Sequence, residues 1–431
     1  MRVTPVPGRI STEIYSDRIT MTDISRQDST GIAYSDLCPH FGDCGGCAAQ
    51  DVPYARQVAD KAAYLQELFG AYWSEAIPVT PSPGLWHYRN KVDPAFAPKH
   101  YDTPPPKDFK RDTVLGYKRK GKWFWPLDVN ECRIGPLGMA ELLAAMRVWY
   151  QREGLDAFDG RKNLGLLRNL LIRDAKRTGQ RMVVLITHEG ALPADSFVEA
   201  VQAAWPADSI YHGVNTKKAD VAIAEELTLL HGAPVIEEKL VLTENGAERP
   251  LRFRISPFSF FQTNPLATEK LYSVIRSWVR DISPGLLYDL YGGMGSIAFS
   301  CADLVREVIS VECVESASED GRLNAVDNQI DNVTFVTAQV EKYLRVRRDE
   351  NDLPREATVI LDPARSGLHP KALKYLLEIL PENIIYVSCN PKLLARELPL
   401  FLEAYQIDKF QAFDLFPHTP HVEALVALRR R

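Results

Sequence analysis

Two side chains that could take part in covalent chemistry follow predicted buried strands near the end of the chain. The apolar run 384–388 leads directly into Cys389, and a second apolar run, 358–361, leads into Asp362. In an open α/β sheet, ligands bind at the carboxyl ends of the strands, so we expect both side chains at one edge of a sheet. A thiol beside a carboxylate indicates covalent catalysis if a cofactor pocket lies next to them.

A glycine-rich turn predicts such a pocket. Residues 286–291 have the pattern of a first strand, and Gly-Gly-Met-Gly follows at 292–295. Glycine allows the backbone to approach a ligand closely. The next strand, 307–311, ends at Glu312, about 20 residues after the glycines, where a Rossmann-type fold places a carboxylate on a ribose. The turn alone also fits a plain tight turn, whereas the turn together with Glu312 favours a ribose-bearing cofactor.

Five motifs between residues 260 and 423 together resemble those of the RNA uracil-5 methyltransferases. Their joint order is far more specific than any one motif. The resemblance implies a Rossmann-like catalytic domain that uses S-adenosylmethionine to form 5-methyluridine in RNA. The motifs are Phe-Phe-Gln-Thr-Asn-Pro at 260–265, Asp-Leu-Tyr-Gly-Gly-Met-Gly at 289–295, Leu-Asp-Pro-Ala-Arg-Ser-Gly at 361–367, Val-Ser-Cys-Asn-Pro at 387–391 and His-Val-Glu at 421–423.

The implied chemistry requires a nucleophile, a polar group at the base and a proton acceptor. Carbon 5 of uracil is a poor nucleophile, but addition of a thiolate to carbon 6 concentrates negative charge on carbon 5, which then attacks the methyl group. A base afterwards removes the carbon-5 proton, and the thiol is eliminated. By the motif matches, Cys389 is the nucleophile, Asp362 holds the uracil edge or the cofactor, and Glu423 is the base.

Each of these assignments has a plainer alternative from the residues alone. Cys389 also fits a buried thiol at a strand end, and Asp362 also fits a cap of the following helix. Glu423 also fits a solvated strand residue, on the face opposite the apolar residues that alternate with it. His418 and His421 are other possible bases, ranked below Glu423.

The segment around Asp362 departs slightly from the family pattern, which is usually Asp-Pro-Pro-Arg. Ala364 replaces the second proline and leaves the functional side chains in place. For Arg365 two roles stay open, a contact with Asp362 or a contact with an RNA phosphate.

The motif matches also assign the cofactor contacts. Glu312 takes the ribose hydroxyls, and Tyr291 lies near the methionine moiety. Ser296 stands where the family commonly has Asn, and Gln339 matches an adenine-side position less directly. The predicted cofactor residues are Gln262, Tyr291, Ser296, Glu312, Gln339 and Asp362.

Three of the seven cysteines lie within ten residues of one another, in a Cys-x5-Cys-x2-Cys pattern. In a cytosolic chain this spacing indicates metal binding before disulfides, and four thiolates suit either zinc or an iron–sulfur cluster. Several family members carry a [4Fe-4S] cluster on cysteines so spaced, and the resemblance implies the same here. The implied ligands are Cys38, Cys44, Cys47 and Cys132. Cys301 and Cys313 are predicted to be packing residues.

The sequence predicts three parts. Residues 1–36 form a polar arm, 37–256 an α+β domain that carries the iron–sulfur cluster and binds RNA, and 257–431 the Rossmann-like methyltransferase domain. Many relatives begin with a small β-barrel RNA-binding domain, for which the residues before Cys38 are too few. The expected elements of the middle part are helices at 53–73, 139–153 and 195–204, and strands at 182–186, 209–215 and 239–242.

The composition is that of a soluble globular protein. Hydrophobic residues make up 45% of the 431 residues, and charged residues make up 25%. There is no apolar run long enough to cross a membrane and no secretory signal at the amino terminus. We therefore expect a cytoplasmic protein that does not contact membranes and acts as a monomer.

The net charge of −5 is unusual for an RNA-binding protein, but the distribution of charge decides binding. Lys and Arg outnumber Asp in the segments 99–122 and 161–181. In the first of these, the stretch 117–125 places aromatic residues beside the cations, and such surfaces bind phosphates and stack unpaired bases. By itself that stretch also fits a β-hairpin with a solvated basic turn.

Several substrates and functions stay open. The leading hypothesis is a specific uridine of 23S ribosomal RNA, because most bacterial relatives with a cluster act there. The uridine would be unpaired, because a thiolate cannot reach carbon 6 inside a helix. The same chemistry on transfer RNA is the closest alternative. A non-catalytic RNA-binding or assembly factor and a methyltransferase of exocyclic amines are the others.

Overall fold

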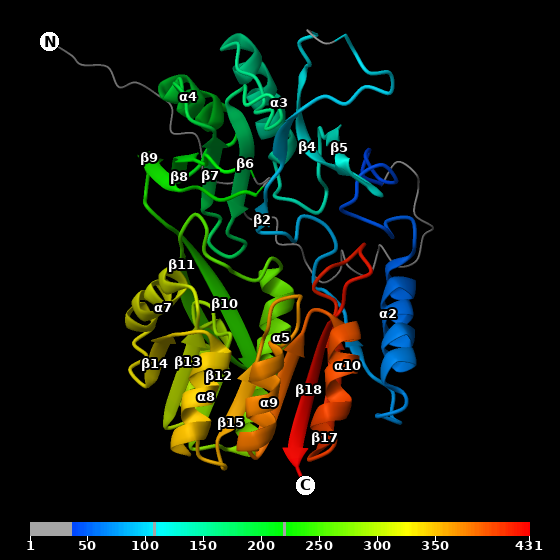
Figure 1. Ribbon diagram of the computed structural model, residues 1–431, viewed down its shortest axis with the longest axis vertical. Coiled ribbons are helices and arrows are strands. Elements are labelled where there is room, and N and C mark those ends of the chain that lie inside the picture. Colours follow the sequence, from blue (N-terminus) through cyan, green and yellow to red (C-terminus); the bar gives the residue numbers. More distant parts are fainter. Residues whose placement is uncertain (1–36, 107–108, 219–220) are drawn as a thin grey trace, which may run out of the picture.

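The computed structural model describes residues 37–106, 109–218 and 221–431. The arm predicted for residues 1–36, and with it the question of a preceding β-barrel, lies outside these residues. The described chain contains two eight-stranded sheets, one above the other in Figure 1, and a separate two-stranded hairpin. None of its helices is both long and apolar enough to span a bilayer.

The lower sheet has the order β1-β17-β18-β16-β15-β12-β13-β14. Its strands from β12 to β16 pair in parallel, whereas β18 runs antiparallel to both β16 and β17. The predicted parallel α/β sheet is thereby confirmed. The strands are β1 (Val79–Thr80), β12 (Leu286–Leu290), β13 (Glu307–Glu312), β14 (Val333–Thr337), β15 (Thr358–Leu361), β16 (Asn383–Ser388), β17 (Tyr405–Phe413) and β18 (Glu423–Arg430).

Helices cover both faces of the lower sheet, which explains why its strands are continuous apolar runs. Successive residues alternate between the two faces, so that Leu287 packs in one core and Tyr288 in the other. On one face lie α2 (Tyr54–Phe69), α8 (Val340–Glu350), α9 (Pro370–Ile379) and α10 (Pro391–Phe401). On the other lie α5 (Pro265–Ile282), α6 (Ser296–Cys301), the short η2 (Ala302–Leu304), α7 (Glu315–Asp327) and the hairpin of β10 (Ile236–Glu244) and β11 (Ala247–Ile255).

The strand order reverses at β12. The chain proceeds outward from β12 to β13 and β14, and then crosses back to β15 on the other side. Ligands of open α/β sheets bind at the carboxyl ends of the strands beside such a reversal. In Figure 1 the arrow of β18 points away from the upper sheet, so the carboxyl ends of the parallel strands point toward it.

The upper sheet has the order β5-β4-β3-β6-β7-β8-β9, and β2 pairs with β6 beside β3. Helices α3 (Met139–Arg152) and α4 (Ala194–Ala204) pack on it around a core that includes Trp149 and Trp205. The strands are β2 (Lys91–Val92), β3 (Ala95–Pro98), β4 (Thr113–Arg119), β5 (Lys122–Asp128), β6 (Leu167–Asp174), β7 (Arg181–Thr187), β8 (Ser209–Val214) and β9 (Glu226–Gly232). The helices expected at 139–153 and 195–204 and the strands expected at 182–186 and 209–215 are confirmed in this part, and so is the β-hairpin at 117–125. The elements expected at 53–73 and 239–242 form as α2 and β10, outside the upper sheet.

The two sheets are joined by segments that cross between them. Helix α2 and strand β1 precede the upper sheet in sequence but belong to the lower one. The hairpin of β10 and β11 precedes residue 256 but packs on α5 and α7. Arg173 of the upper sheet is 1% exposed and donates to the carbonyls of Pro257 and Ser259. The domain boundary proposed at residue 256 stays a prediction. Several segments before this residue pack with the lower sheet.

Candidate functional site

The edge of the lower sheet brings Asp362, Cys389 and Glu423 together. Asp362 follows the last residue of β15, and Cys389 follows the last residue of β16. Strand β18 begins at Glu423 and pairs with β16 so that Ser388 lies opposite Ala424. The next position in this antiparallel register places Cys389 opposite Glu423.

These groups lie in a poorly solvated site. Glu423 is 2% exposed, so it is not the solvated strand residue of the alternative interpretation. Burial raises its pKa well above the ordinary value, and Asp362 raises it further. Burial, with the nearby carboxyl of Asp289, raises the pKa of Asp362 to about 7. In the free protein, Asp362 is therefore partly protonated near neutral pH, and burial favours the protonated form of Glu423.

The thiol of Cys389 is subject to the same forces. Burial, with Glu423 and Asp362, raises its pKa to about 11, whereas Arg365 acts in the opposite direction. Arg365 is exposed at the rim of the site and also lowers the pKa of Glu423. The thiol is thus protonated at neutral pH in the free protein, and Arg365 is the nearby cation that favours its ionised form.

A cavity of about 610 Å³ lies over the carboxyl ends of β12, β13, β15 and β16. It brings together the three residues described above and most of the predicted cofactor contacts, which come from distant parts of the sequence. The predicted residues that line it are Gln262, Tyr291, Ser296, Glu312, Asp362, Cys389 and Glu423. Gln339 is exposed at the start of α8 and is not part of this lining.

The glycine-rich turn after β12 forms the floor of the cavity. Tyr291, Gly293 and Gly295 have φ angles of 66°, 57° and 83°. A Cβ atom at Gly292 would lie 2.1 Å from the hydroxyl oxygen of Ser310, so this position accepts only glycine without a rearrangement. The turn therefore requires glycine for its packing as well as for the close approach of a ligand.

Glu312 faces this turn from the end of β13. Its Oε2 accepts a hydrogen bond from the amide of Gly293 at 3.0 Å, and its Oε1 accepts one from the amide of Val314 at 2.8 Å. An ionised carboxylate has about four acceptor sites, so two remain for the hydroxyls of a ligand. Glu312 thus lines the cavity beside the glycine-rich turn, and its contact with a ribose stays a prediction.

Gln262 and Asp362 meet across the cavity, although 100 residues separate them in sequence. The side-chain nitrogen of Gln262 lies 3.5 Å from Oδ2 of Asp362. The backbone around Gln262 is fixed by Asn90, whose side chain donates to the Gln262 carbonyl at 3.0 Å and whose amide donates to Thr263 at 2.9 Å. Asn264 then caps α5 by accepting from the amide of Ala267.

The two histidines ranked below Glu423 lie outside this cavity. His418 is 3% exposed, and its ring stacks on Trp86 with 4.1 Å between the ring centroids. Burial lowers its pKa to about 4, with a further contribution from Lys61. His421 lines a different cavity, described below. Neither imidazole shares the cofactor cavity with Glu423.

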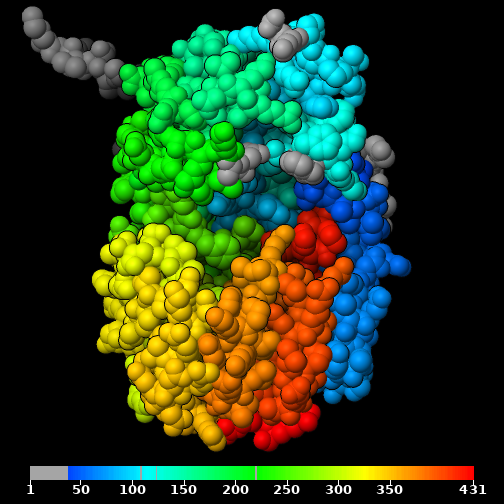
Figure 2. Space-filling view, viewed as in Figure 1, coloured from blue at the N-terminus to red at the C-terminus, as the bar shows by residue number. Residues whose placement is uncertain are grey.

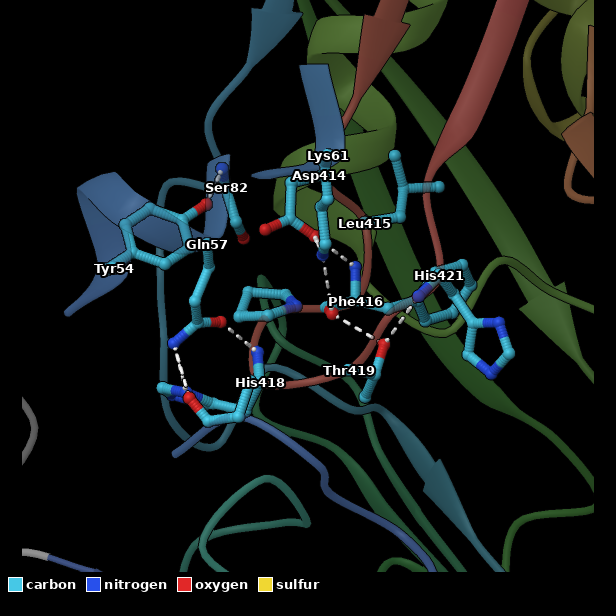
Figure 3. Close-up of polar contacts among 12 residues, drawn as sticks. Tyr54, Gln57, Lys61, Ser82, Asp414, Leu415, Phe416, His418, Thr419 and His421 are labelled. Carbon is cyan, nitrogen blue, oxygen red and sulfur yellow. Dashed lines mark hydrogen bonds and ion pairs between the residues drawn. The ribbon is translucent and has the colours of Figure 1, made fainter. Parts of the chain in front are cut away.

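The loop between β17 and β18, which leads to Glu423, is fastened to helix α2 (Figure 3). Lys61 donates to Oδ1 of Asp414 at 2.7 Å and to the carbonyl of Phe416 at 3.2 Å. The side-chain oxygen of Gln57 accepts from the amide of His418 at 2.8 Å. The sequence interpretation missed these contacts. The available signal was a glutamine and a lysine four residues apart on the buried face of the predicted helix, where polar groups require partners.

The four predicted ligand cysteines line one cavity of about 660 Å³ beside the hairpin of β4 and β5. The loop that carries the first three pairs with this hairpin: the Gly45 amide donates to Lys118 at 3.2 Å, and the Lys120 amide donates to Asp43 at 2.7 Å. Across the described residues, no three His, Cys, Asp or Glu side chains are grouped so that they could hold a single metal ion. Cys301 is buried as predicted, whereas Cys313 is exposed and lines the cofactor cavity.

The chain is similar to known RNA-modifying enzymes over nearly its whole length. A family model described as tRNA (Uracil-5-)-methyltransferase matches residues 224–431. An uncharacterized RNA methyltransferase of Clostridium tetani is 34% identical over 91% of this chain and 84% of its own length. Another, from Caldanaerobacter subterraneus, has the same identity and coverage.

Among solved structures, the Pyrococcus abyssi tRNA (uracil-54, C5)-methyltransferase in complex with S-adenosyl-L-homocysteine has a similar fold. It superimposes with a TM-score of 0.68 and is 30% identical, covering 90% of this chain and 86% of that chain. The similarity extends over both sheets and is not confined to the lower one.

Replacing Glu423 with Gln should lower the pKa of Cys389, because it removes a carboxylate that opposes ionisation of the thiol. We expect the alkylation profile of Cys389 with iodoacetamide to move by about one pH unit toward lower pH. Mass spectrometry of the peptide that contains Cys389 gives the rate at each pH. The matched variant Arg365→Gln should move the profile in the opposite direction. A profile unchanged in Glu423→Gln would contradict the electrostatic contact.

Replacing Lys61 with Met should leave the buried carboxylate of Asp414 without its cation. The two side chains are 5% and 0% exposed, so we expect a loss of about 3–5 kcal/mol in the free energy of unfolding. Urea denaturation measures the loss, and the double variant with Asp414→Leu should recover much of it. As a control, Arg56→Ala removes an ion pair that is 71% and 54% exposed and should cost about 1 kcal/mol or less.

Proposed function

Because the chain belongs to the tRNA (uracil-5-)-methyltransferase family, whose members transfer methyl groups from S-adenosylmethionine to RNA, we propose a specific reaction for it. It methylates carbon 5 of a specific unpaired uridine in 23S ribosomal RNA through a covalent cysteine–uracil intermediate. The observation that carries this proposal is the meeting of Cys389, Asp362 and Glu423 in one cavity that also holds the glycine-rich turn and Glu312.

The cavity has the features that S-adenosylmethionine requires. The glycine turn permits close approach of the backbone, and the carboxylate of Glu312 has free acceptor sites for the ribose. Tyr291 and Gln262 complete the walls. The bound cofactor supplies the methyl group, whereas the protein must activate the uracil.

Cys389, which is partly exposed, loses its proton to solvent, and Arg365 favours the thiolate, which then adds to carbon 6 of the uracil. Negative charge then develops on the carbonyl oxygen at carbon 4 and on carbon 5. Asp362 has a pKa of about 7 and can donate a hydrogen bond from its protonated form to that oxygen. This interaction strengthens as the charge develops, so it lowers the barrier to addition.

Glu423 removes the proton from carbon 5 after methyl transfer. Its burial raises its pKa, and a carboxylate with a raised pKa is a stronger base once it has ionised. The register of β16 and β18 brings Glu423 close to Cys389. Glu423 would therefore take the proton from the side of the uracil ring to which the thiol is attached. The thiol is then eliminated and the double bond is restored.

Two observations bear on the choice of RNA. The cysteine pattern resembles that of bacterial relatives that act on ribosomal RNA, which supports 23S ribosomal RNA. The similarity to the Pyrococcus abyssi enzyme, which is described as acting on uracil 54 of transfer RNA, favours transfer RNA as the second candidate.

The upper sheet offers a surface for either RNA. The two basic segments predicted from the sequence meet there at one cavity of about 630 Å³. Lys118 of the first segment and Arg161, Lys162 and Arg168 of the second line it, together with the aromatic ring of Phe158. Cations beside an aromatic face bind phosphates and unpaired bases. We infer that this cavity holds RNA outside the catalytic centre.

We also propose that Cys38, Cys44, Cys47 and Cys132 hold a [4Fe-4S] cluster. The observation that supports this proposal is that all four cysteines line one cavity, and four thiolates are the usual ligands of an iron–sulfur cluster. Its contribution would be structural, joining the cysteine loop to the segment after β5. The methyl transfer itself requires no redox step.

Incubation with RNA that contains 5-fluorouridine tests the covalent mechanism. Fluorine at carbon 5 cannot be removed as a proton, so the enzyme should remain attached to the RNA after methyl transfer. We expect an adduct that resists denaturation, is seen on gels and mass spectra, and is absent in Cys389→Ala. Ribosomal and transfer RNA are tested in parallel, and mapping the adduct identifies the uridine. Methylation without an adduct on either RNA would favour amine methylation. Absence of both methylation and adduct would favour a non-catalytic RNA-binding role.

Replacing Cys44 with Ser should reduce the iron and sulfide bound by anaerobically purified protein and weaken its visible absorption. We also expect a lower unfolding midpoint, because the cysteine loop loses a cross-link to the rest of the upper part. The matched control is Cys313→Ser, an exposed cysteine outside the cysteine cavity, which should retain the full iron content. Equal iron content in both variants would refute the assignment of Cys44 as a ligand.

A further inference from the structure

A second cavity, of about 570 Å³, opens at Cys389 and is not used by the reaction described above. It shares Cys389 and Arg365 with the cofactor cavity, and its other walls come from elsewhere. They are supplied by the end of the cysteine loop, helix α2, the start of α10 and the loop before β18. The reactive thiol therefore stands at a rim between two cavities.

The polar side chains of this second cavity are largely engaged within the protein (Figure 3). The side-chain nitrogen of Gln57 donates to the carbonyls of Ala49 and Val52 at 2.8 Å. Lys61 is paired with Asp414, and the hydroxyl of Thr419 donates to the carbonyl of Phe416 at 2.8 Å. What the walls offer to a ligand is mainly apolar surface, from Ala48, Ala49, Val52, Pro391, Pro420 and Val422.

Cations stand at the mouth of the cavity. Arg365 and Lys392 are exposed, and within the described part of the chain neither forms a salt bridge. Asp60 also lines the cavity, but its carboxylate accepts from Arg56 at 2.7 Å. A complementary ligand would place a flat apolar group against the apolar walls and an anionic group at the two cations. A nucleotide, with its base and its phosphate, has both groups.

His421 adds a flat surface to the cavity. Its ring is partly buried and lies edge-on to Phe416, with 6.1 Å between the centroids. Burial lowers its pKa, with contributions from Arg365 and Lys61, and so favours the neutral imidazole. A neutral ring can stack on a nucleobase without a preference for its hydrogen-bonding pattern.

We propose that this second cavity holds the nucleotide adjoining the target uridine, with its base against the apolar walls and its phosphate at Arg365 and Lys392. The proposal rests on the proposed function. Consecutive nucleotides share one phosphate, so a uridine over Cys389 in the cofactor cavity brings its neighbour to the common rim. Holding the neighbour out of its stack offsets the cost of unstacking the target. The polar side chains of the cavity are bonded to other groups of the protein and do not read the hydrogen-bonding edge of a base. The cavity should therefore accept any unpaired neighbouring base.

The test uses a synthetic fragment of 23S ribosomal RNA or transfer RNA that contains the uridine trapped by the 5-fluorouridine experiment. Single-turnover methylation is compared for the intact fragment and for fragments that lack one base, on the 5′ or the 3′ side of the target. In the native enzyme we expect removal of one of the two bases to lower kcat/KM by about tenfold or more. In Val52→Trp, whose indole fills the cavity, the same removal should have little effect.

A second pair tests the phosphate contact and does not depend on how the cavity-filling variant folds. Replacing the adjoining phosphate with a neutral methylphosphonate should lower kcat/KM of the native enzyme by about tenfold. The loss should disappear in Lys392→Ala, which alters an exposed side chain. Lys162→Ala in the basic cavity of the upper sheet is the contrast: it should weaken binding of all fragments but keep the full effect of the methylphosphonate.

The proposal would be overturned if base removal and phosphate neutralisation lowered kcat/KM of the variants as much as that of the native enzyme. So would a native enzyme that is indifferent to both changes while methylating the intact fragment. Absence of both methylation and adduct in the native enzyme would instead refute the proposed function, and the nucleotide site with it. The two failures are thus distinguished by activity on the intact fragment.

Discussion

The antiparallel pairing of β18 with β16 is the constraint on which the site depends. The other central strands of the lower sheet are parallel and deliver their side chains from carboxyl ends only. Because β18 runs the opposite way, its first residue, Glu423, arrives at the same edge as Cys389, the residue after the last one of β16. The proposed nucleophile and the proposed base thus lie in one cavity, although they are 34 positions apart in the chain.

Burial of this edge sets its electrostatics. Three carboxyls, those of Asp289, Asp362 and Glu423, lie in or beside the cavity with the thiol, and desolvation raises the pKa of each group. At neutral pH Cys389 is therefore a thiol in the free protein, and burial favours the protonated forms of the three carboxyls. In the proposed reaction, the charge that develops on the uracil during addition would lie next to Asp362.

The loop before β18 is held from outside the lower sheet, which links the two halves of the molecule. Helix α2 fixes it through Lys61 and Gln57, and the carbonyl of His418 accepts from the amides of Ala48 and Ala49 at the end of the cysteine loop. The hollow between the upper and lower parts is visible in Figure 2. The cysteine loop is therefore part of the support for the catalytic edge, and a structural role for a cluster there is consistent with these contacts.

The sequence by itself determined the local features. The apolar runs and the turns after them located β12, β13, β15 and β16, and the motifs identified Cys389, Asp362 and Glu312, because strand periodicity and turn chemistry act over a few residues. Tertiary structure alone decided the rest. Whether Glu423 is solvated or buried depends on the antiparallel insertion of β18, which no local pattern specifies. That α2 packs on the lower sheet, that Cys313 is exposed, and that two basic segments form one cavity depend on contacts between residues far apart in sequence. So does the second cavity at Cys389, whose walls come from four separate segments that only the packed chain brings together.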